Sequence, residues 1–149
     1  MTHGREAKMI WKVKPDLAAL SRMQENTIAS VIGLEFTEVG DDYIRGTLPV
    51  DHRTHQPMGI LHGGASVVLA ESLGSMAANL CVDTRHQYCV GLDINANHVR
   101  PVRSGRVTGT AKPLHLGKST QVWEIRIEDE AGRLTCVSRL TMAVLSREN

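Results

Sequence analysis

The stretch HQPMGILHGGASVVLAE, from His55 to Glu71, carries residues of this 149-residue chain that suit acyl chemistry. Glu71 is a carboxylate inside a run of small and apolar residues, where a buried charge is costly unless it is paired or used. Gly63 and Gly64 begin the same run at the start of a predicted helix, where backbone N–H groups lack partners and favour negative charge. Such donors stabilise a carbonyl oxygen that develops charge during attack.

Two more side chains complete this candidate site. Gln56 lies in the loop before the helix and carries an amide that can donate a hydrogen bond to the same carbonyl. Ser75 follows Glu71 by four residues on the same helical face, where it can orient the carboxylate or a water molecule. Each feature also has a purely structural interpretation: a carboxylate satisfied by hydrogen bonds, glycines in a tight turn, a solvated glutamine and a small packing serine.

The spacing of Gly63 and Glu71 predicts that one active site uses two chains. Eight residues separate them, which is about 12 Å along a helix. One carbonyl group cannot lie within hydrogen-bond distance of both residues. A two-fold dimer with antiparallel central helices would place the start of one helix beside the middle of the other. We therefore expect a homodimer with two shared sites.

Two short helices are predicted near the N-terminus. The segment PDLAALSRMQ places Leu17, Leu20 and Met23 at helical spacing, and TIASVI forms a second helix capped by Asn26 and closed by Gly33. The runs LEFTEV and YIRGTLPV then flank a glycine and two aspartates, a pattern that predicts a β-hairpin.

The longest helical candidate runs from Gly63 to about Leu80. It is apolar on nearly every side, which indicates a buried helix. Four extended runs follow it, QYCVGLDINANHVRPV, VTGTAKPLHL, TQVWEIRIED and LTCVSRLTMAVL, and they predict three or four long antiparallel strands. The expected fold class is α+β, with an antiparallel sheet wrapped around one long central helix.

Length and composition favour a single domain over residues 1–149, with 1–8 as a loose extension if Met9 is the true start. The net charge of +1 and the 3% aromatic content give no basis for nucleic-acid binding. No apolar run is long enough to span a bilayer, and the first residues lack the apolar segment of a signal peptide. We expect a cytoplasmic protein without a nucleic-acid or membrane partner.

Metal, disulfide and serine-hydrolase chemistry are not predicted. The three cysteines, at positions 81, 89 and 136, are widely spaced and form no CxxC pair, which is typical of buried, inert thiols. Three histidines, His52, His55 and His62, crowd one loop but match no zinc spacing. The sequence GGAS does not fit the GxSxG motif of serine hydrolases. We expect neither a metal nor a cofactor.

The segment RTHQPMGILHGGASVVLAESLGSMA resembles the active-site segment of the hotdog-fold acyl-CoA thioesterases. It is similar in particular to the subgroup that contains 1,4-dihydroxy-2-naphthoyl-CoA thioesterase and the proofreading thioesterase of enterobactin synthesis. VGLDINANHVRPV and PLHLGK also match this family in order and spacing, and the likeness extends from Met9 to TMAVL near the C-terminus. The resemblance implies a hotdog fold, a dimer-of-dimers homotetramer and an acyl-CoA substrate, whose CoA is part of the substrate rather than a cofactor.

The resemblance also implies roles for the candidate residues. Glu71 matches the catalytic carboxylate, which either attacks the thioester carbonyl or activates a water molecule. Gly63 matches the backbone oxyanion donor, and Gln56 the side chain that contacts the carbonyl. His62 matches a position that helps hold the thioester end, and Ser75 one that helps position the carboxylate. In this family the carboxylate faces the oxyanion donor of the neighbouring subunit.

Candidates for binding the CoA phosphates lie in two segments. PLHLGK offers His115, Gly117 and Lys118, because a glycine turn provides backbone N–H groups beside a lysine. NANHVR offers His98 and Arg100, by likeness to the family.

The implied acyl group is aromatic, as in 1,4-dihydroxy-2-naphthoyl-CoA, benzoyl-CoA or hydroxybenzoyl-CoA, and the first of these would belong to menaquinone biosynthesis. Met58 stands where relatives commonly carry Phe after QP; if it lines the acyl pocket, a broader acyl range is expected. Three alternatives stay open: proofreading on an acyl or aryl carrier protein, a hotdog dehydratase that uses His62 and Glu71, and a non-catalytic acyl-CoA binding protein. Release of free thiol from benzoyl-CoA separates a thioesterase from the last two.

Overall fold

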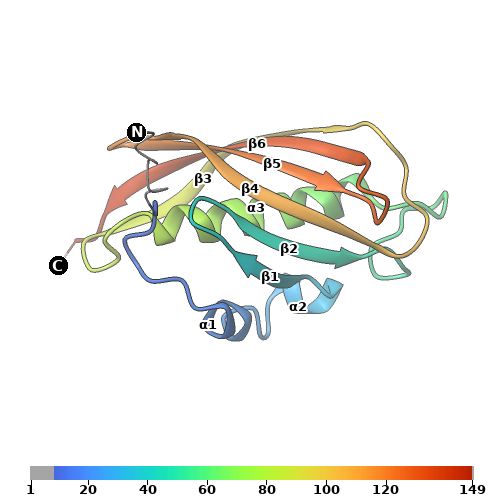
Figure 1. Cartoon of the computed structure of the whole chain (residues 1–149), viewed down its shortest axis with the longest axis horizontal. Helices are drawn as coiled ribbons and strands as arrows, with labels where there is room; N and C mark the ends of the chain where they lie inside the picture. The colour runs from blue at the N-terminus through green and yellow to red at the C-terminus, as the bar shows by residue number, and fades with distance from the viewer. Residues whose placement is uncertain (1–8, 149) are drawn as a thin grey trace, which may run out of the picture.

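Six strands form one sheet in the computed structural model, which describes residues 9–148 (Figure 1). They are β1 (Glu35–Val39), β2 (Ile44–Pro49), β3 (Gln87–His98), β4 (Arg106–Leu116), β5 (Thr120–Glu128) and β6 (Leu134–Ser146). Neighbouring strands are antiparallel in the order β1-β2-β4-β5-β6-β3, so β1 and β3 are the two edges. The predicted hairpin is confirmed as β1 and β2, and four strands follow the central helix. The expected N-terminal extension, residues 1–8, lies outside the described residues.

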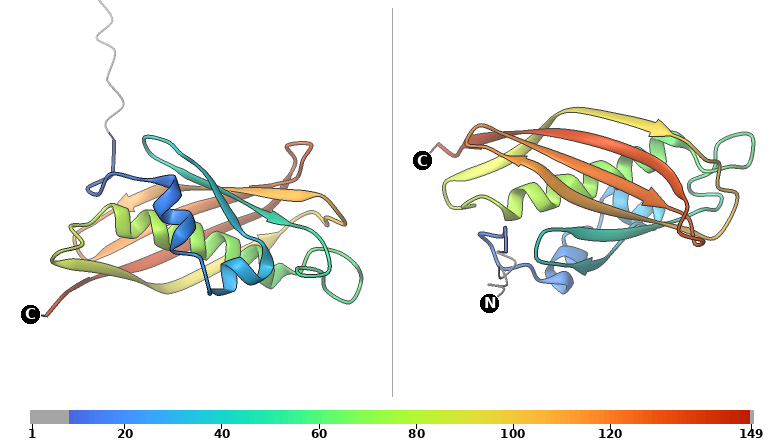
Figure 2. Two further views of the ribbon diagram at one scale, coloured as in Figure 1. Left: turned by 90° about the horizontal axis from the view of Figure 1, so that it is seen from below. Right: turned by 45° about the horizontal axis from the view of Figure 1, so that its top comes forward.

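The predicted long helix is α3 (Gly63–Leu80), and it lies along the inner face of the curved sheet (Figure 2). It contacts β2, β3, β4, β5 and β6. Gly46 and Gly109 face each other across β2 and β4, and a Cβ atom on either would lie within 3 Å of Leu73. The missing side chains let α3 pack closely on the sheet, where Leu69 and Leu73 are fully buried. Burial of each leucine contributes about 2 kcal/mol. The predicted α+β fold class is confirmed.

One face of α3 is less buried than predicted. Leu69 and Leu73 face the sheet, whereas the opposite side of the helix is only half-buried by residues 9–148. The half-buried side chains are Ala65, Val67, Val68, Glu71, Ser72, Ser75, Met76 and Asn79. The expectation that α3 is buried on nearly every side is therefore wrong for a single chain, although the residues themselves are mostly apolar or small.

The two short helices are α1 (Leu17–Arg22) and α2 (Ile28–Ile32). The first packs against β1 and the second against α3. Of the three apolar residues predicted at helical spacing in the first segment, only Leu20 is buried, while Leu17 is 38% exposed and Met23 is 61% exposed. A single apolar position thus holds α1 against the core.

The predicted cap of the second helix is wrong by one residue. Thr27 occupies the N-cap position, and Asn26 precedes it with a φ of 60°, a left-handed conformation that asparagine tolerates. The predicted end at Gly33 is confirmed.

The three cysteines are free and buried, as predicted. Burial raises the pKa of each thiol, that of Cys81 to about 12. They therefore remain protonated and unreactive near neutral pH. Among the helices of residues 9–148, none is both long enough and apolar enough to cross a bilayer. Within the same residues, no group of three His, Cys, Asp or Glu side chains is arranged to hold a metal ion.

Candidate active site

Gln56, Gly63 and His98 come together in a hollow of about 380 Å³ at the start of α3, which we call the donor hollow. The loop between β2 and α3 supplies Gln56, and the end of β3 supplies His98. The Nε2 atom of His98 lies 2.8 Å from the position that a Cβ would take on Gly63, so any side chain there would displace the imidazole. Arg100 lines the same hollow from the segment that follows β3.

The side chain of Gln56 is oriented by its own loop. Its Oε1 atom accepts a hydrogen bond from the backbone N–H of Met58. The Nε2 amino group is therefore the end of the amide that can donate to a ligand. Met58 itself is 77% exposed and lines neither the donor hollow nor the hollow around Glu71, so its predicted contact with the acyl group stays a prediction.

The two glycines at the start of α3 differ. The N–H of Gly64 donates to Nδ1 of His62, the N-cap residue, at 2.8 Å. The expectation that both glycines offer free N–H groups is therefore wrong for Gly64. Within residues 9–148 no hydrogen bond satisfies the N–H of Gly63, which lies beside Gln56. Because Nδ1 of His62 accepts, Nε2 carries the proton of the neutral ring; the predicted contact of His62 with the thioester stays a prediction.

Glu71 lies in a separate hollow of about 360 Å³, which we call the carboxylate hollow. Ser75, one turn further along α3, lines it too. The Ser75 hydroxyl donates to Sδ of Met142 at 3.8 Å, and in the described part of the chain no hydrogen bond joins it to Glu71. Its predicted role as a positioning residue stays a prediction. The other lining residues are Met23, Gln24, Ser72, Met76 and Asn79.

Gly91 makes room for the Glu71 carboxylate. A Cβ atom at position 91 would lie 2.7 Å from Oε1 of Glu71. Next to it β3 has a bulge at Leu92, because Gly91 pairs with Met142 while Asp93 pairs with the preceding residue of β6. The sequence analysis missed Gly91, although a glycine inside a strand pattern indicates a bulge or a close approach.

A single chain does not bring the carboxylate to the donors. Gln56 and Gly63 line one hollow, Glu71 lines the other, and no residue lines both. His62 lines neither hollow. The pair that a dehydratase would need, His62 and Glu71, is therefore not assembled within one chain either.

The CoA candidates fall into two distant groups. His98 and Arg100 belong to the donor hollow, whereas Gly117 and Lys118 line a hollow of about 430 Å³ beside Cys81, just after the last turn of α3. The length of α3 separates the two groups by about 25 Å. Only the first group can share an active site with Gly63 of the same chain.

The turn between β4 and β5 is more closed than predicted. The N–H of Gly117 donates to the carbonyl of Thr120 at 2.9 Å, and the His115 ring packs against the same glycine. The expectation that this glycine turn offers a free N–H at Gly117 is therefore wrong, because the hairpin itself uses it. Lys118 remains exposed beside the turn.

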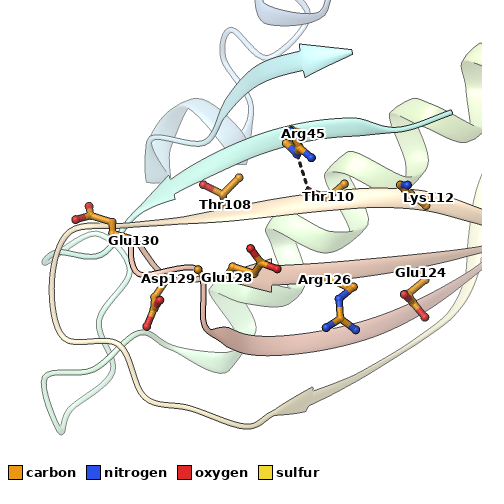
Figure 3. Close-up of a pocket in the computed structure, with 10 residues that line it drawn as sticks. Arg45, Thr108, Thr110, Lys112, Glu124, Arg126, Glu128, Asp129 and Glu130 are labelled. Atoms are coloured by element: carbon orange, nitrogen blue, oxygen red, sulfur yellow. Dashed lines mark hydrogen bonds between the residues drawn. The ribbon is translucent and has the colours of Figure 1, made fainter. Parts of the chain in front are cut away.

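A further hollow of about 550 Å³ lies on the outer face of the sheet (Figure 3). It is lined by charged side chains of both signs, and it contains none of the predicted site residues. Lys112 and Glu124 are opposite each other on β4 and β5, and Arg45 donates to Thr110 at 3.0 Å. This pattern is typical of the solvated face of an antiparallel sheet.

Comparison with known proteins gives a consistent result. The model of the family described as "Thioesterase superfamily" matches residues 58–136. The chain is 58% identical to the 1,4-dihydroxy-2-naphthoyl-CoA hydrolase of Escherichia coli, over 92% of this chain and 100% of the relative. It is 52% identical to a proofreading thioesterase, EntH, of Cronobacter turicensis, over 92% of this chain and 99% of the relative.

Solved structures are similar over most of the chain. A mutant thioesterase from Pseudomonas aeruginosa is 54% identical and superposes with a TM-score of 0.91, over 93% of this chain and 99% of that chain. A Staphylococcus aureus protein, 36% identical, was crystallised as two mutants that replace a glutamine and a glutamate 15 positions apart; the TM-scores are 0.76 and 0.77, over 78% and 80% of this chain and 97% and 99% of theirs. Gln56 and Glu71 are also 15 positions apart.

Proposed function

Because the chain belongs to the thioesterase superfamily, we propose that it hydrolyses aromatic acyl-CoA thioesters at active sites that are each built from two subunits. One observation carries this proposal. Gln56 and Gly63 present two donors in one hollow, while Glu71 occupies another hollow that shares no lining residue with it. A second copy of the chain would unite them.

The proposed reaction uses each residue in turn. The thioester carbonyl accepts hydrogen bonds from the Gly63 N–H and the Gln56 amino group, which stabilise the oxyanion. Glu71 of the partner subunit either attacks the carbonyl carbon or removes a proton from the attacking water. On either route the C–S bond breaks and CoA leaves as its thiolate. Direct attack leaves a mixed anhydride on Glu71 that water then hydrolyses, whereas an activated water gives the free acid at once. Single-turnover hydrolysis in ¹⁸O water tests for direct attack, because only a mixed anhydride on Glu71 can carry the label into that carboxylate.

Two exposed features support the pairing of two chains. The first is β3, a twelve-residue edge strand whose free backbone groups can extend into a second sheet. On it, Val90 is 40% exposed and Leu92 is 62% exposed. The second is the half-buried face of α3. Antiparallel packing of two α3 helices about an axis at Val67, the midpoint of Gly63 and Glu71, would place these two residues opposite each other.

We place the enzyme in the cytoplasm as a dimer or a dimer of dimers. Cytoplasmic thiols stay reduced, which suits three free cysteines. The substrate best supported is 1,4-dihydroxy-2-naphthoyl-CoA, a step in quinone supply, because a 58% identical relative is named for its hydrolysis. A second candidate is an aroyl carrier protein, favoured by the 52% identical relative that is named a proofreading thioesterase.

A thiol-release assay tests the proposal. The panel holds 1,4-dihydroxy-2-naphthoyl-CoA, benzoyl-CoA, medium-chain and long-chain acyl-CoA and an aroyl carrier protein. We expect the highest kcat/KM on an aromatic CoA thioester. A preference for the carrier protein would favour proofreading instead, and no release from any substrate would identify a non-catalytic binding protein.

A further inference from the structure

The carboxylate hollow differs from the donor hollow in charge. Its lining residues include no lysine or arginine, and they include the thioethers of Met23 and Met76. The donor hollow instead contains Arg100. Phosphate-bearing CoA therefore fits the donor side, and an uncharged acyl group fits beside Glu71, where methionine sulfur makes favourable contacts with aromatic rings.

Two polar side chains of the carboxylate hollow, Asn79 and Ser75, already have hydrogen-bond partners within the described residues. Nδ2 of Asn79 donates to the carbonyls of Ser75 and Cys89, and its Oδ1 accepts from the N–H of Cys89. The Ser75 hydroxyl donates to Met142. Ser72 carries a hydroxyl that can both donate and accept, so it does not select for either kind of ligand group.

Gln24 carries an amide oxygen that can only accept. Its Nε2 donates to the carbonyl of Leu20 at 3.1 Å, which ties the amide to α1 and leaves Oε1 for another donor. In the described part of the chain Oε1 has no hydrogen-bond partner. The turn that carries it is held in place, because the Gln24 N–H donates to Ser21 and its carbonyl accepts from the Thr27 hydroxyl at 2.6 Å. Gln24 thus offers an unpartnered acceptor on a well-held turn that lines the same hollow as the catalytic carboxylate.

We propose that Gln24 selects substrates whose aromatic acyl group carries a hydroxyl, by accepting a hydrogen bond from that hydroxyl at Oε1. This inference rests on the proposed function and adds a specificity-determining residue to it, because Gln24 would favour hydroxylated over unhydroxylated aroyl thioesters. A ring without a hydroxyl leaves this acceptor unpaired once it is covered, and such a loss reduces binding by roughly tenfold.

The test compares two substrate pairs that differ by hydroxyl groups. They are 4-hydroxybenzoyl-CoA with benzoyl-CoA, and 1,4-dihydroxy-2-naphthoyl-CoA with 2-naphthoyl-CoA. We expect the wild type to favour the hydroxylated member in kcat/KM by about tenfold. Gln24→Met keeps the length of the side chain without its acceptor, and its ratio should fall to about one. Gln24→Glu keeps an acceptor and should retain the preference.

Glu25→Gln provides the matched control, because the neighbouring side chain is exposed and lines neither hollow. Its selectivity ratio should equal that of the wild type. An equal ratio in the wild type and Gln24→Met would overturn the role of Gln24 while leaving the thioesterase in place.

Binding tests Gln24 independently of turnover. The inert thioethers 4-hydroxyphenacyl-CoA and phenacyl-CoA report on the hydroxyl by calorimetry even in an enzyme that releases no thiol. A Kd ratio that falls to about one in Gln24→Met supports the inference, and a ratio that does not change overturns it. Absence of thiol release from all four substrates would instead contradict the proposed function alone.

Discussion

The donor hollow and the carboxylate hollow are built in different ways. In the donor hollow backbone groups supply or orient the donors: Gly63 offers its own N–H, and the Met58 N–H orients the side chain of Gln56. In the carboxylate hollow a single side chain, Glu71, has steric support from Gly91 but no hydrogen bond to Ser75 in the described residues. Stabilisation of the oxyanion thus depends on the position of the backbone, whereas attack on the thioester depends on one side chain. Substitutions should therefore reduce activity to different extents in the two hollows.

The largest effect is expected in the carboxylate hollow. Glu71→Ala removes the group that attacks or activates water, so kcat should fall by on the order of 10³-fold or more. Stability should change little, since Glu71 is only half-buried. Glu124→Ala is the matched control, because it removes a half-buried glutamate from the outer sheet face and should keep full activity. Turnover of Glu71→Ala near that of this control would exclude Glu71 as the catalytic carboxylate.

Mixed subunits test whether the two hollows come from different chains. Gly63→Pro removes the donor N–H at the first helical position, where proline is tolerated. Mixed with Glu71→Ala, it should restore about a quarter of wild-type activity, because half the dimers are mixed and each holds one intact site. Subunit exchange is verified by mass spectrometry of the native dimer.

The same experiment needs a steric control. A Cβ at position 63 would lie 2.8 Å from Nε2 of His98, so proline also disturbs that ring. Gly63→Ala adds the same Cβ but keeps the N–H, and it should retain more activity than Gly63→Pro. Proven exchange without recovery would show that each site lies within one chain.

Much of the fold follows from periodicity in the sequence. Alternation of apolar and polar residues predicts strand β5, whose buried positions include Trp123, Ile125 and Ile127. The small and apolar run predicts α3, but periodicity cannot say which face of an all-apolar helix meets the sheet. That face is set by the glycine pair Gly46 and Gly109, which only the strand register brings together under Leu73.

The part of the candidate site that lies in one continuous segment could be predicted from the sequence. Gln56, Gly63 and Glu71 lie within 16 consecutive residues, so their spacing alone shows that one helix separates donors from carboxylate. Gln24 and Gly91 were missed as neighbours of Glu71, because long-range packing places them there. The prediction of a free N–H at Gly117 was wrong for a local reason, because that N–H donates to Thr120 within the hairpin turn.

Gly91→Ala probes the steric support of the carboxylate. The new methyl group would displace Oε1 of Glu71, and kcat should fall by on the order of tenfold with little change in KM. Gly91 has no left-handed φ, so alanine fits the backbone. In a Glu71→Ala background the clash is gone, and the same change should raise the free energy of unfolding by about 0.5 kcal/mol. Denaturant unfolding of the four variants measures this coupling, and equal effects in both backgrounds would contradict the contact.

The last prediction concerns substrate binding alone and tests which hollow binds the CoA phosphates. Arg100 lines the donor hollow beside Gln56 and Gly63, whereas Lys118 lies about 25 Å away along α3. Arg100→Ala should raise the KM for benzoyl-CoA about tenfold through loss of a charged hydrogen bond, and leave the KM for benzoyl-N-acetylcysteamine, which has no phosphates, much less affected. Lys118→Ala should raise the KM for benzoyl-CoA by less. The reverse order would assign the phosphates to the Lys118 turn of another subunit, because α3 keeps that turn away from Gly63 of its own chain.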